Sequence, residues 1–206
     1  MLKNHFKLTF VDINPEVITA LSRHGNMLRY CDFRIGDIFK EHGGSLVSPA
    51  NSYGDMRGGI DKQYSKRFAG LEGRLKSYIE SYHGGRLEIG KAQIVPTHDE
   101  KFPYVIVTPT VENPGDQASE GSVLKAMEAV LKETLWLNNT QEISKKIEQL
   151  LCPGLGTGSG GLAPGDAARA IATAYRQVQS NTRKLLADNP YLKNSYLCSQ
   201  QILGRN

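Results

Sequence analysis

Short apolar stretches alternate along this chain with longer segments whose apolar positions recur every three or four residues. The short stretches are rich in branched and aromatic side chains, which favours β-strands. Strands that alternate with amphipathic helices are typical of a layered α/β fold. The expected strands cover residues 7–11, 27–33, 45–48, 92–95, 104–108 and 147–151.

Four amphipathic segments predict helices. The first is marked by Asn14 and Pro15, the residue types of an N-cap and a first helical position, and Gly25 is expected to end it. A second apolar stripe contains several aromatic residues, which we interpret as core packing, and Gly70 and Gly73 are expected to interrupt it. The last three stripes lie at Tyr64, Phe68, Leu71, Leu75, Tyr78, Ile79 and Tyr82, at Val123, Met127, Val130, Leu131 and Thr134, and at Ala167, Ile171, Ala174, Tyr175 and Val178.

The size of the chain favours one domain. A chain of 206 residues with 39% hydrophobic content can bury one good core but not two full ones. We therefore expect a single domain over residues 1–206. Residues 189–206 show little periodicity, so no element is predicted for this tail.

Composition and charge narrow the classes of partner and cofactor that we expect. The net charge of +4 comes from scattered lysines and arginines, so nucleic-acid binding is not indicated, and a mild positive field equally suits a small anionic metabolite. No secretory leader and no apolar run of roughly 18 residues is present, which predicts a cytoplasmic protein without a membrane partner.

The cysteines Cys31, Cys152 and Cys198 lie far apart, so neither a disulfide framework nor a metal site is expected from them. No other cofactor is expected. His42 and His83 each precede a glycine pair, and either would be an acid–base candidate if it lined a crevice.

A glycine-rich segment lies between a predicted strand and a predicted helix. Glycine occupies five of the eight positions from Gly154 to Gly161, and a helix is expected to begin at Pro164. Glycine lets backbone N–H groups approach an anion, and a helix N-terminus adds further donors. The segment therefore predicts a phosphate cradle, although no lysine follows it as Walker A chemistry would require.

A second glycine-bearing loop follows the strand expected at 45–48. Its sequence runs from a polar turn through Gly58 and Gly59 into a helix. Ligands of open α/β sheets collect at the carboxyl ends of strands, so the two loops are expected to face each other across one crevice. Taken alone, either loop also fits an ordinary turn.

The glycine spacing also matches a dinucleotide fingerprint. Gly156, Gly158 and Gly161 have the required separation, but the acidic residue that should follow about 20 positions later falls within or near a helix. A dinucleotide-dependent dehydrogenase is therefore disfavoured.

Three motifs together resemble the macro domain family, which binds ADP-ribose. They are Gly36-Asp37-Ile38-Phe39, then Val47 to Ser52 with Gly58-Gly59-Ile60-Asp61, and then Pro153 to Gly161. They fall within residues 36–61 and 152–164. The sequence around Ser52 is similar to that of a divergent macro-domain-like branch of the family. The resemblance implies a three-layer α/β/α fold with a central mixed sheet.

The resemblance assigns a role to each motif. Asp37 would accept a hydrogen bond from the adenine amino group, with the Ile38 backbone placing the base, although an aspartate here also fits a turn or helix cap. Asn51 would lie beside the distal ribose. The diphosphate would be held by backbone amides of Gly58, Gly59, Ile60, Gly156, Thr157, Gly158, Ser159 and Gly160, with the Thr157 and Ser159 hydroxyls as extra donors.

Asp61 is the catalytic candidate that the resemblance implies, together with Asn51. Some hydrolytic macro domains carry an aspartate at this point, where it would orient or deprotonate a water aimed at the anomeric carbon. The alternative is that Asp61 only caps the helix that follows.

Several positions depart from the family pattern. Arg57 replaces a common glycine, where it would either pair with phosphate or obstruct the amide cradle. Gly160 and Leu162 replace aromatic residues over the ribose, and Ser65 replaces the histidine of some hydrolytic members. The tail also offers no clear strand to supply an aromatic residue for the adenine.

These observations predict a protein that binds ADP-ribose or a close derivative. The expected reaction is hydrolysis at the distal ribose, which would remove a 1″-phosphate or release an ADP-ribosyl group from an acceptor such as a protein. Two alternatives stay open: a non-catalytic reader of free or protein-attached ADP-ribose, and a binder of another nucleotide-like signal.

Overall fold

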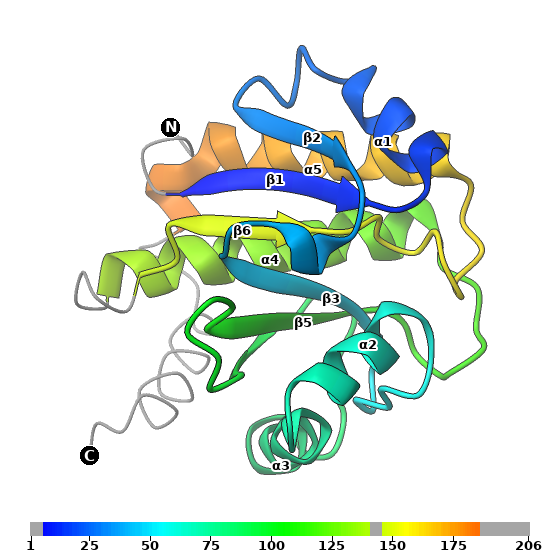
Figure 1. Cartoon of the computed structure of the whole chain (residues 1–206). Helices are drawn as coiled ribbons and strands as arrows, with labels where there is room; N and C mark the ends of the chain where they lie inside the picture. The colour runs from blue at the N-terminus through cyan, green and yellow to red at the C-terminus, as the bar shows by residue number, and fades with distance from the viewer. Residues whose placement is uncertain (1–5, 141–145, 186–206) are drawn as a thin grey trace.

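A six-stranded sheet runs through the centre of the protein, in the strand order β2-β1-β6-β3-β5-β4 (Figure 1). The structure is a computed structural model that describes residues 6–140 and 146–185. Five strands are mutually parallel, and only the edge strand β4 runs antiparallel to its neighbour β5. The strands are β1 (Lys7–Asp12), β2 (Cys31–Ile35), β3 (Ser45–Asn51), β4 (Gln93–Pro96), β5 (Tyr104–Val111) and β6 (Gln149–Cys152).

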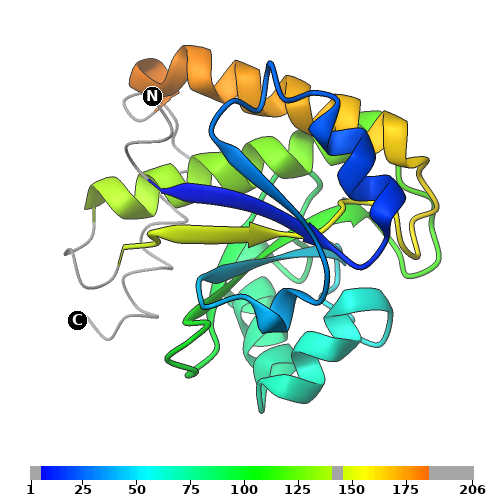
Figure 2. The same cartoon turned by 45° about the horizontal axis from the view of Figure 1, so that its top comes forward.

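Helices cover both faces of this sheet and make three layers. Alternate strand residues point to opposite faces, so Phe10 packs in a core beneath one set of helices and Val11 in a core beneath the other. Figures 1 and 2 show α1, α4 and α5 on one side of the sheet and α2 and α3 on the other. The helices are α1 (Pro15–Ser22), α2 (Gly59–Arg67), α3 (Leu71–His83), α4 (Glu120–Thr140) and α5 (Pro164–Leu185), with a short 3₁₀ helix, η2, at Ile38–Lys40.

The predicted α/β/α fold with a mixed sheet is confirmed, and the local signals explain most element bounds. Asn14 caps α1, because its side chain accepts a hydrogen bond from the Glu16 N–H at 2.9 Å. A helix also begins at Pro164, as the sequence predicts. Gly70 separates α2 from α3 with φ of +72°. Gly73, by contrast, lies inside α3, so the expectation that it interrupts the helix was wrong.

The strand expected over residues 27–33 begins later than predicted, at Cys31. Met27 and Leu28 lie in a turn after α1, where both backbone N–H groups donate to the His24 carbonyl. Leu28 is nevertheless buried in the core. An apolar run therefore marked burial here but not sheet pairing.

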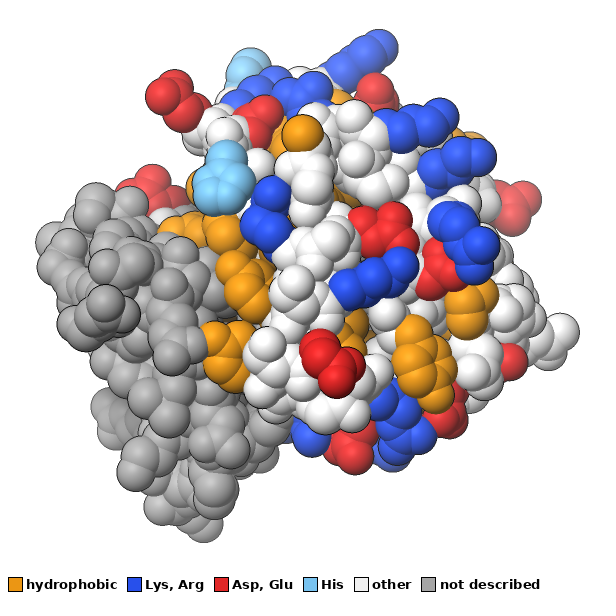
Figure 3. Space-filling view, turned by 90° about the horizontal axis from the view of Figure 1, so that it is seen from below, with side chains coloured by type: hydrophobic (Ala, Val, Ile, Leu, Met, Phe, Trp, Pro, Cys, Tyr) orange, Lys and Arg blue, Asp and Glu red, His pale blue; other side chains and the backbone are white. Residues whose placement is uncertain are grey.

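The charged side chains and the helices of the described residues bear on the expected partners. Figure 3 shows basic and acidic side chains interspersed on the face that it displays. In the part of the chain that the structure describes, no helix is both long and apolar enough to cross a bilayer. The tail 189–206 and Cys198 lie outside the described residues.

The core beneath α3 offers a test of the packing. Leu75 is fully buried, so Leu75→Ala should lower the free energy of unfolding by about 2–5 kcal/mol through lost burial and a residual cavity. Ile35 is 62% exposed, and Ile35→Ala should cost well under half of that. Urea denaturation followed by circular dichroism measures both, and equal losses would contradict this assignment of the core.

Candidate functional site

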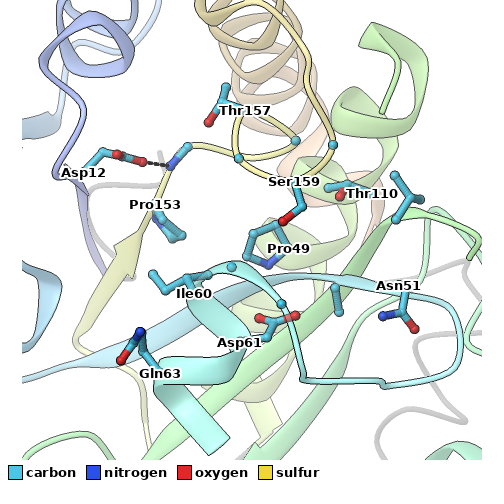
Figure 4. A pocket seen from close by; sticks show the side chains of 18 of the residues that line it. Asp12, Pro49, Asn51, Ile60, Asp61, Gln63, Thr110, Pro153, Thr157 and Ser159 are labelled. Carbon is cyan, nitrogen blue, oxygen red and sulfur yellow. Dashed lines mark hydrogen bonds between the residues drawn. The ribbon is translucent and has the colours of Figure 1, made fainter. Parts of the chain in front are cut away.

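The carboxyl ends of the parallel strands open onto one cavity of about 940 Å³. Both glycine-bearing loops line it, on opposite sides, as Figure 4 shows. A Cβ placed on Gly59 would lie 3.5 Å from the Ser159 Oγ, so the two loops approach each other closely. The predicted crevice between the loops is therefore present.

The loop after β6 is held in shape by its own backbone. The Leu162 N–H donates to the Gly156 carbonyl at 2.9 Å, and the Ala118 N–H donates to the Gly160 carbonyl at 2.8 Å. Gly156 has φ of +73°, and a Cβ on it would lie 2.8 Å from the side chains of Ala118, just before α4, and Val123, within α4. The loop is thus a tight turn that only glycine fits at this point.

This loop leaves backbone donors available. Within the described residues, the N–H groups of Thr157, Gly158, Ser159 and Gly160 donate to no other group of the protein. All four residues line the cavity. Unpaired N–H groups that line one concavity are a binding site for an anion.

The opposing loop ends at the N-terminus of α2. Gly58 is the N-cap, with extended φ of −117° and no side-chain cap, and Gly59 has φ of +51°. The first N–H groups of a helix have no partner within it, and the helix dipole places partial positive charge there. Gly58, Gly59 and Ile60 all line the cavity, so this helix end is directed at the same space as the loop after β6.

Asp37 and Ile38 line the far end of the cavity, beyond β2. The Asp37 side chain caps η2, because Oδ1 accepts a hydrogen bond from the Phe39 N–H at 2.9 Å. The capping role considered for Asp37 is therefore present. A carboxylate has further acceptor sites, so the cap leaves a lone pair for a ligand.

Asn51 lines the cavity at the end of β3, but its amide is already engaged. Nδ2 donates to the Asp55 carbonyl at 2.8 Å, and Oδ1 accepts from the N–H groups of Tyr53 and Asp55 at 3.1 and 3.2 Å. In this arrangement Asn51 shapes the loop before α2. One Nδ2 hydrogen remains for a ligand.

Asp61 lies in the first turn of α2, with only 6% of its surface exposed, and it lines the cavity. Its Oδ1 accepts a hydrogen bond from the Ser48 Oγ at 2.6 Å, and Gly58, not Asp61, is the residue at the helix cap. Burial raises the Asp61 pKa from 3.8 to about 6, against the lowering effect of the Ser48 hydrogen bond. A carboxyl group with this pKa changes protonation close to neutral pH.

Comparison with known proteins identifies the family of this chain. A family model described as Macro domain matches residues 47–171, which is more than half of the chain. This chain belongs to the macro domain family.

One relative and several solved structures resemble this macro domain. An uncharacterized protein of Aquifex aeolicus (strain VF5) is 32% identical over 146 residues, which cover 70% of this chain and 79% of that protein. The macrodomain of Mycobacterium tuberculosis DarG has a TM-score of 0.58 at 23% identity, covering 69% of this chain and 88% of that one. Thermosipho africanus DarTG in complex with ADP-ribose has a TM-score of 0.52 at 18% identity, covering 68% of this chain and 36% of that one. The structural likeness shows that the fold is shared.

In this macro domain, every site residue predicted from the sequence lines the one cavity. The structure thus brings together the three motifs, although their roles toward a ligand stay predictions. Neither His42 nor His83 lines it, and His83 instead lies 3.0 Å from Gln93 Oε1 through its Nε2. Because neither histidine lines the cavity, neither is placed to serve it as an acid or base, and burial separately lowers the His83 pKa.

Two departures from the family pattern have a structural explanation. Gly160 cannot carry the aromatic residue common at its position in this arrangement, because a Cβ there would lie 2.9 Å from both the Ala118 Cβ and the Gly156 carbonyl oxygen. Arg57 does not block the amide cradle, because its guanidinium forms a bidentate ion pair with Asp55 and its side chain is 83% exposed. That pair holds the Asp55 pKa at about 2.

Several cavity residues escaped the sequence analysis. Asp12 ends β1 and Ile13 follows it, Gln63 lies one turn into α2, and five residues lie at the end of β5 or just after it: Thr110, Val111, Pro114, Gly115 and Asp116. The strand ends at Asp12 and Val111 could have been found from the rule that parallel strands end at the ligand. In the described residues, no cluster of three or more His, Cys, Asp or Glu side chains has the geometry of a metal site.

The raised pKa of Asp61 predicts a pH-dependent stability. The folded protein holds this proton more tightly than the unfolded chain does, so Asp61 lowers the free energy of unfolding as pH rises from about 4 to 6. Asp61→Asn removes this effect and should stabilise the protein above pH 6 by up to about 3 kcal/mol, with little change near pH 4. Urea denaturation at pH 4 and 7.5 measures the difference.

A variant of Ser48 should change the pH dependence of stability in the opposite direction to Asp61→Asn. Ser48→Ala removes the donor that favours the ionised form of Asp61, so this variant should lose more stability between pH 4 and 7.5 than the wild type does. A stability gain of Asp61→Asn that is the same at both pH values would contradict the buried, titrating carboxyl group.

Proposed function

We propose that this macro domain binds ADP-ribose, or a close derivative of it, in the cavity between its two glycine loops. The observation that carries the proposal is the convergence of two sets of unpaired backbone N–H groups, from Gly158 and its neighbours and from the N-terminus of α2, on one space. A cavity of about 940 Å³ has the size of a site for a nucleotide-sized ligand. The relative from Thermosipho africanus was solved in complex with ADP-ribose, and a macrodomain of Oceanobacillus iheyensis was solved with ADP.

The charges around the cavity support backbone recognition of the diphosphate. Its described lining contains five aspartates but one cationic side chain, Arg57, which is paired with Asp55. A phosphate therefore gains little from cations here and depends on N–H groups and the α2 dipole. Asp37 and Asn51 follow strands on opposite sides of the β1-β6 pair, so in this proposal the adenine would lie at Asp37 and the distal ribose at Asn51.

We further propose hydrolysis at the distal ribose, with Asp61 as the base. A carboxylate with a pKa of about 6 can accept a proton from water at neutral pH, and its Ser48 hydrogen bond fixes its orientation. The water would attack the anomeric carbon, while the leaving phosphate or acceptor departs with its bonding electrons. Gly58, Gly59 and Ile60 would hold the diphosphate beside this reaction through their backbone.

A non-catalytic reader is the second candidate. It is favoured by the engagement of the Asn51 amide within its own loop and by the 6% exposure of Asp61. A reader would bind free or protein-attached ADP-ribose without turnover.

Binding is tested first by calorimetric titration with ADP-ribose, with AMP and ribose 5-phosphate as controls. We expect a micromolar Kd for ADP-ribose and binding at least tenfold weaker for both fragments, because each lacks part of the contact surface. Equal affinity for AMP and ADP-ribose would show that the diphosphate and distal ribose are not recognised. If another nucleotide binds and ADP-ribose does not, the protein serves a different signal.

Catalysis is tested with ADP-ribose 1″-phosphate and with an ADP-ribosylated protein as substrates. Asp61→Asn should lower kcat by about 10²–10⁴-fold and change the Kd for ADP-ribose less than threefold, because the base acts only on the water. The wild-type rate should rise with pH to a plateau above the Asp61 pKa of about 6. Asp32→Asn, which removes a surface ion pair with Lys7, is the matched control and should leave kcat unchanged.

The outcome separates the two candidates. Release of phosphate or of ADP-ribose by the wild type, lost in Asp61→Asn, supports the hydrolase. Binding without turnover of either substrate supports the reader, and turnover that Asp61→Asn leaves unchanged would remove Asp61 from the mechanism.

A further inference from the structure

Four neighbouring strand ends present different chemistry in one row along the cavity. The row begins with Asp37 after β2, continues with Asp12 at the end of β1 and the glycine loop after β6, and ends with Asn51 at the end of β3. These strands are parallel, so all four ends lie at the same edge of the sheet. Neighbouring strands are about 4.8 Å apart, so each step in the row is about the size of one chemical group of a nucleotide.

The order of this row matches the order of groups in the proposed ligand. With adenine at Asp37 and the diphosphate at the glycine loop, the group between them is the adenosine ribose. It must then lie over the end of β1, where Asp12 and Asn14 are the polar side chains that line the cavity, and the Asn14 Oδ1 is engaged as the cap of α1.

Asp12 is held firmly and still has acceptor sites to offer. Its Oδ2 accepts a hydrogen bond from the Gly154 N–H at 2.9 Å, and its Oδ1 accepts from the Asn14 N–H at 2.8 Å. Its backbone carbonyl accepts from the Gly36 N–H at 2.9 Å, next to the adenine motif. A carboxylate has about four lone-pair sites, so each oxygen keeps one for a ligand.

We propose that Asp12 determines specificity for the adenosine ribose by accepting hydrogen bonds from its 2′- and 3′-hydroxyl groups. This inference rests on the proposed ADP-ribose binding. In this role Asp12 selects an adenosine ribose that carries free hydroxyls over one that is deoxygenated or phosphorylated.

The arrangement has the spatial logic of dinucleotide-binding folds, although not their sequence order. In those folds a glycine-rich loop follows one strand, and an acidic residue at the end of the neighbouring parallel strand binds the adenosine ribose. Here the glycine loop follows β6, β1 is the parallel neighbour of β6, and Asp12 ends β1. The acidic residue precedes the loop by 142 positions, as counted from Asp12 to Gly154, instead of following it.

The charges of the cavity disfavour an adenosine ribose that carries a 2′-phosphate. A 2′-phosphate on the adenosine ribose would lie beside the Asp12 carboxylate, which repels it. Arg57 is the one Lys or Arg side chain of the described cavity lining, and it lies on the loop before α2, paired with Asp55. The cavity therefore provides no cation at β1 to offset the repulsion.

The test compares ligands that differ only at this ribose, by calorimetric titration of the full chain. The probes are ADP against 2′,3′-dideoxy-ADP, and ADP-ribose against its 2′-phosphate on the adenosine ribose. Wild-type protein should bind ADP about tenfold or more tightly than the dideoxy compound, because hydrogen bonds to a charged acceptor are lost. It should discriminate against the 2′-phosphate at least as strongly.

Two variants separate ribose recognition from support of the glycine loop. In Asp12→Ala the preference for ADP over dideoxy-ADP should fall below threefold, and in Asp12→Asn the discrimination against the 2′-phosphate should fall, since the charge is gone. Each preference is a ratio on one variant, so a reduced folded fraction does not affect it. Asp32→Asn, which changes a surface aspartate outside the cavity lining, is the matched control and should keep both preferences.

The outcomes distinguish this inference from the function on which it rests. Asp12 variants that weaken all ligands by one factor and keep both preferences would overturn ribose recognition and leave Asp12 a support of the loop. Wild-type protein that binds ADP-ribose and its 2′-phosphate alike would also overturn it, even if no variant folds. Wild-type protein that binds no adenosine diphosphate ligand would overturn the proposed function itself.

Discussion

The pairing of β6 with β1 on one side and β3 on the other is the interaction on which the rest of the structure depends. β6 has four residues, which pair with β1 at four positions and with β3 at two. It joins the β2-β1 pair to the β3-β5-β4 group, and both cores contact it, through Leu150 on one face and Leu151 on the other. The glycine-rich loop begins where this strand ends, so the same pairing joins the two parts of the sheet and places the centre of the cavity.

The cavity combines unpaired backbone N–H groups with an acidic lining. Backbone N–H groups and a helix end supply the positive potential, while five aspartates surround them. Most of these carboxylates are engaged within the protein: Asp12 with Gly154, Asp37 with Phe39, and Asp55 with Arg57. Asp61 differs from them because burial disfavours its charge, a cost to stability that a structural carboxylate could avoid. This contrast favours a chemical role for Asp61.

Much of the fold and the site could be predicted from the sequence, because the strongest signals are local. Glycine clusters, the Asn14-Pro15 cap and short branched strands act within a few residues, and they located both loops and most elements. The strand-end rule could point to Asp12, but its contacts with Gly36 and Gly154 could not be found this way, because both glycines lie far from it in sequence. The order of strands is likewise a property of the whole chain, and no local pattern states that β6 enters between β1 and β3.

The burial of Asp61 was also beyond sequence reasoning. A first-turn aspartate is favoured at any helix N-terminus, so its position alone fits a cap as well as a base. Only the contact with Ser48, a residue of the opposing strand β3, shows that the side chain turns inward.

The late position of β6 in the chain has a consequence for synthesis at the ribosome. Until residues 149–152 emerge, β1 and β3 each lack a partner along one edge, and both edges carry buried apolar residues such as Phe10 and Val47. Unpaired strand edges of this kind associate with other chains. From the synthesis of β3 until that of β6, the nascent protein therefore carries two unpaired strand edges, and a chaperone that shields them would act before β6 is made.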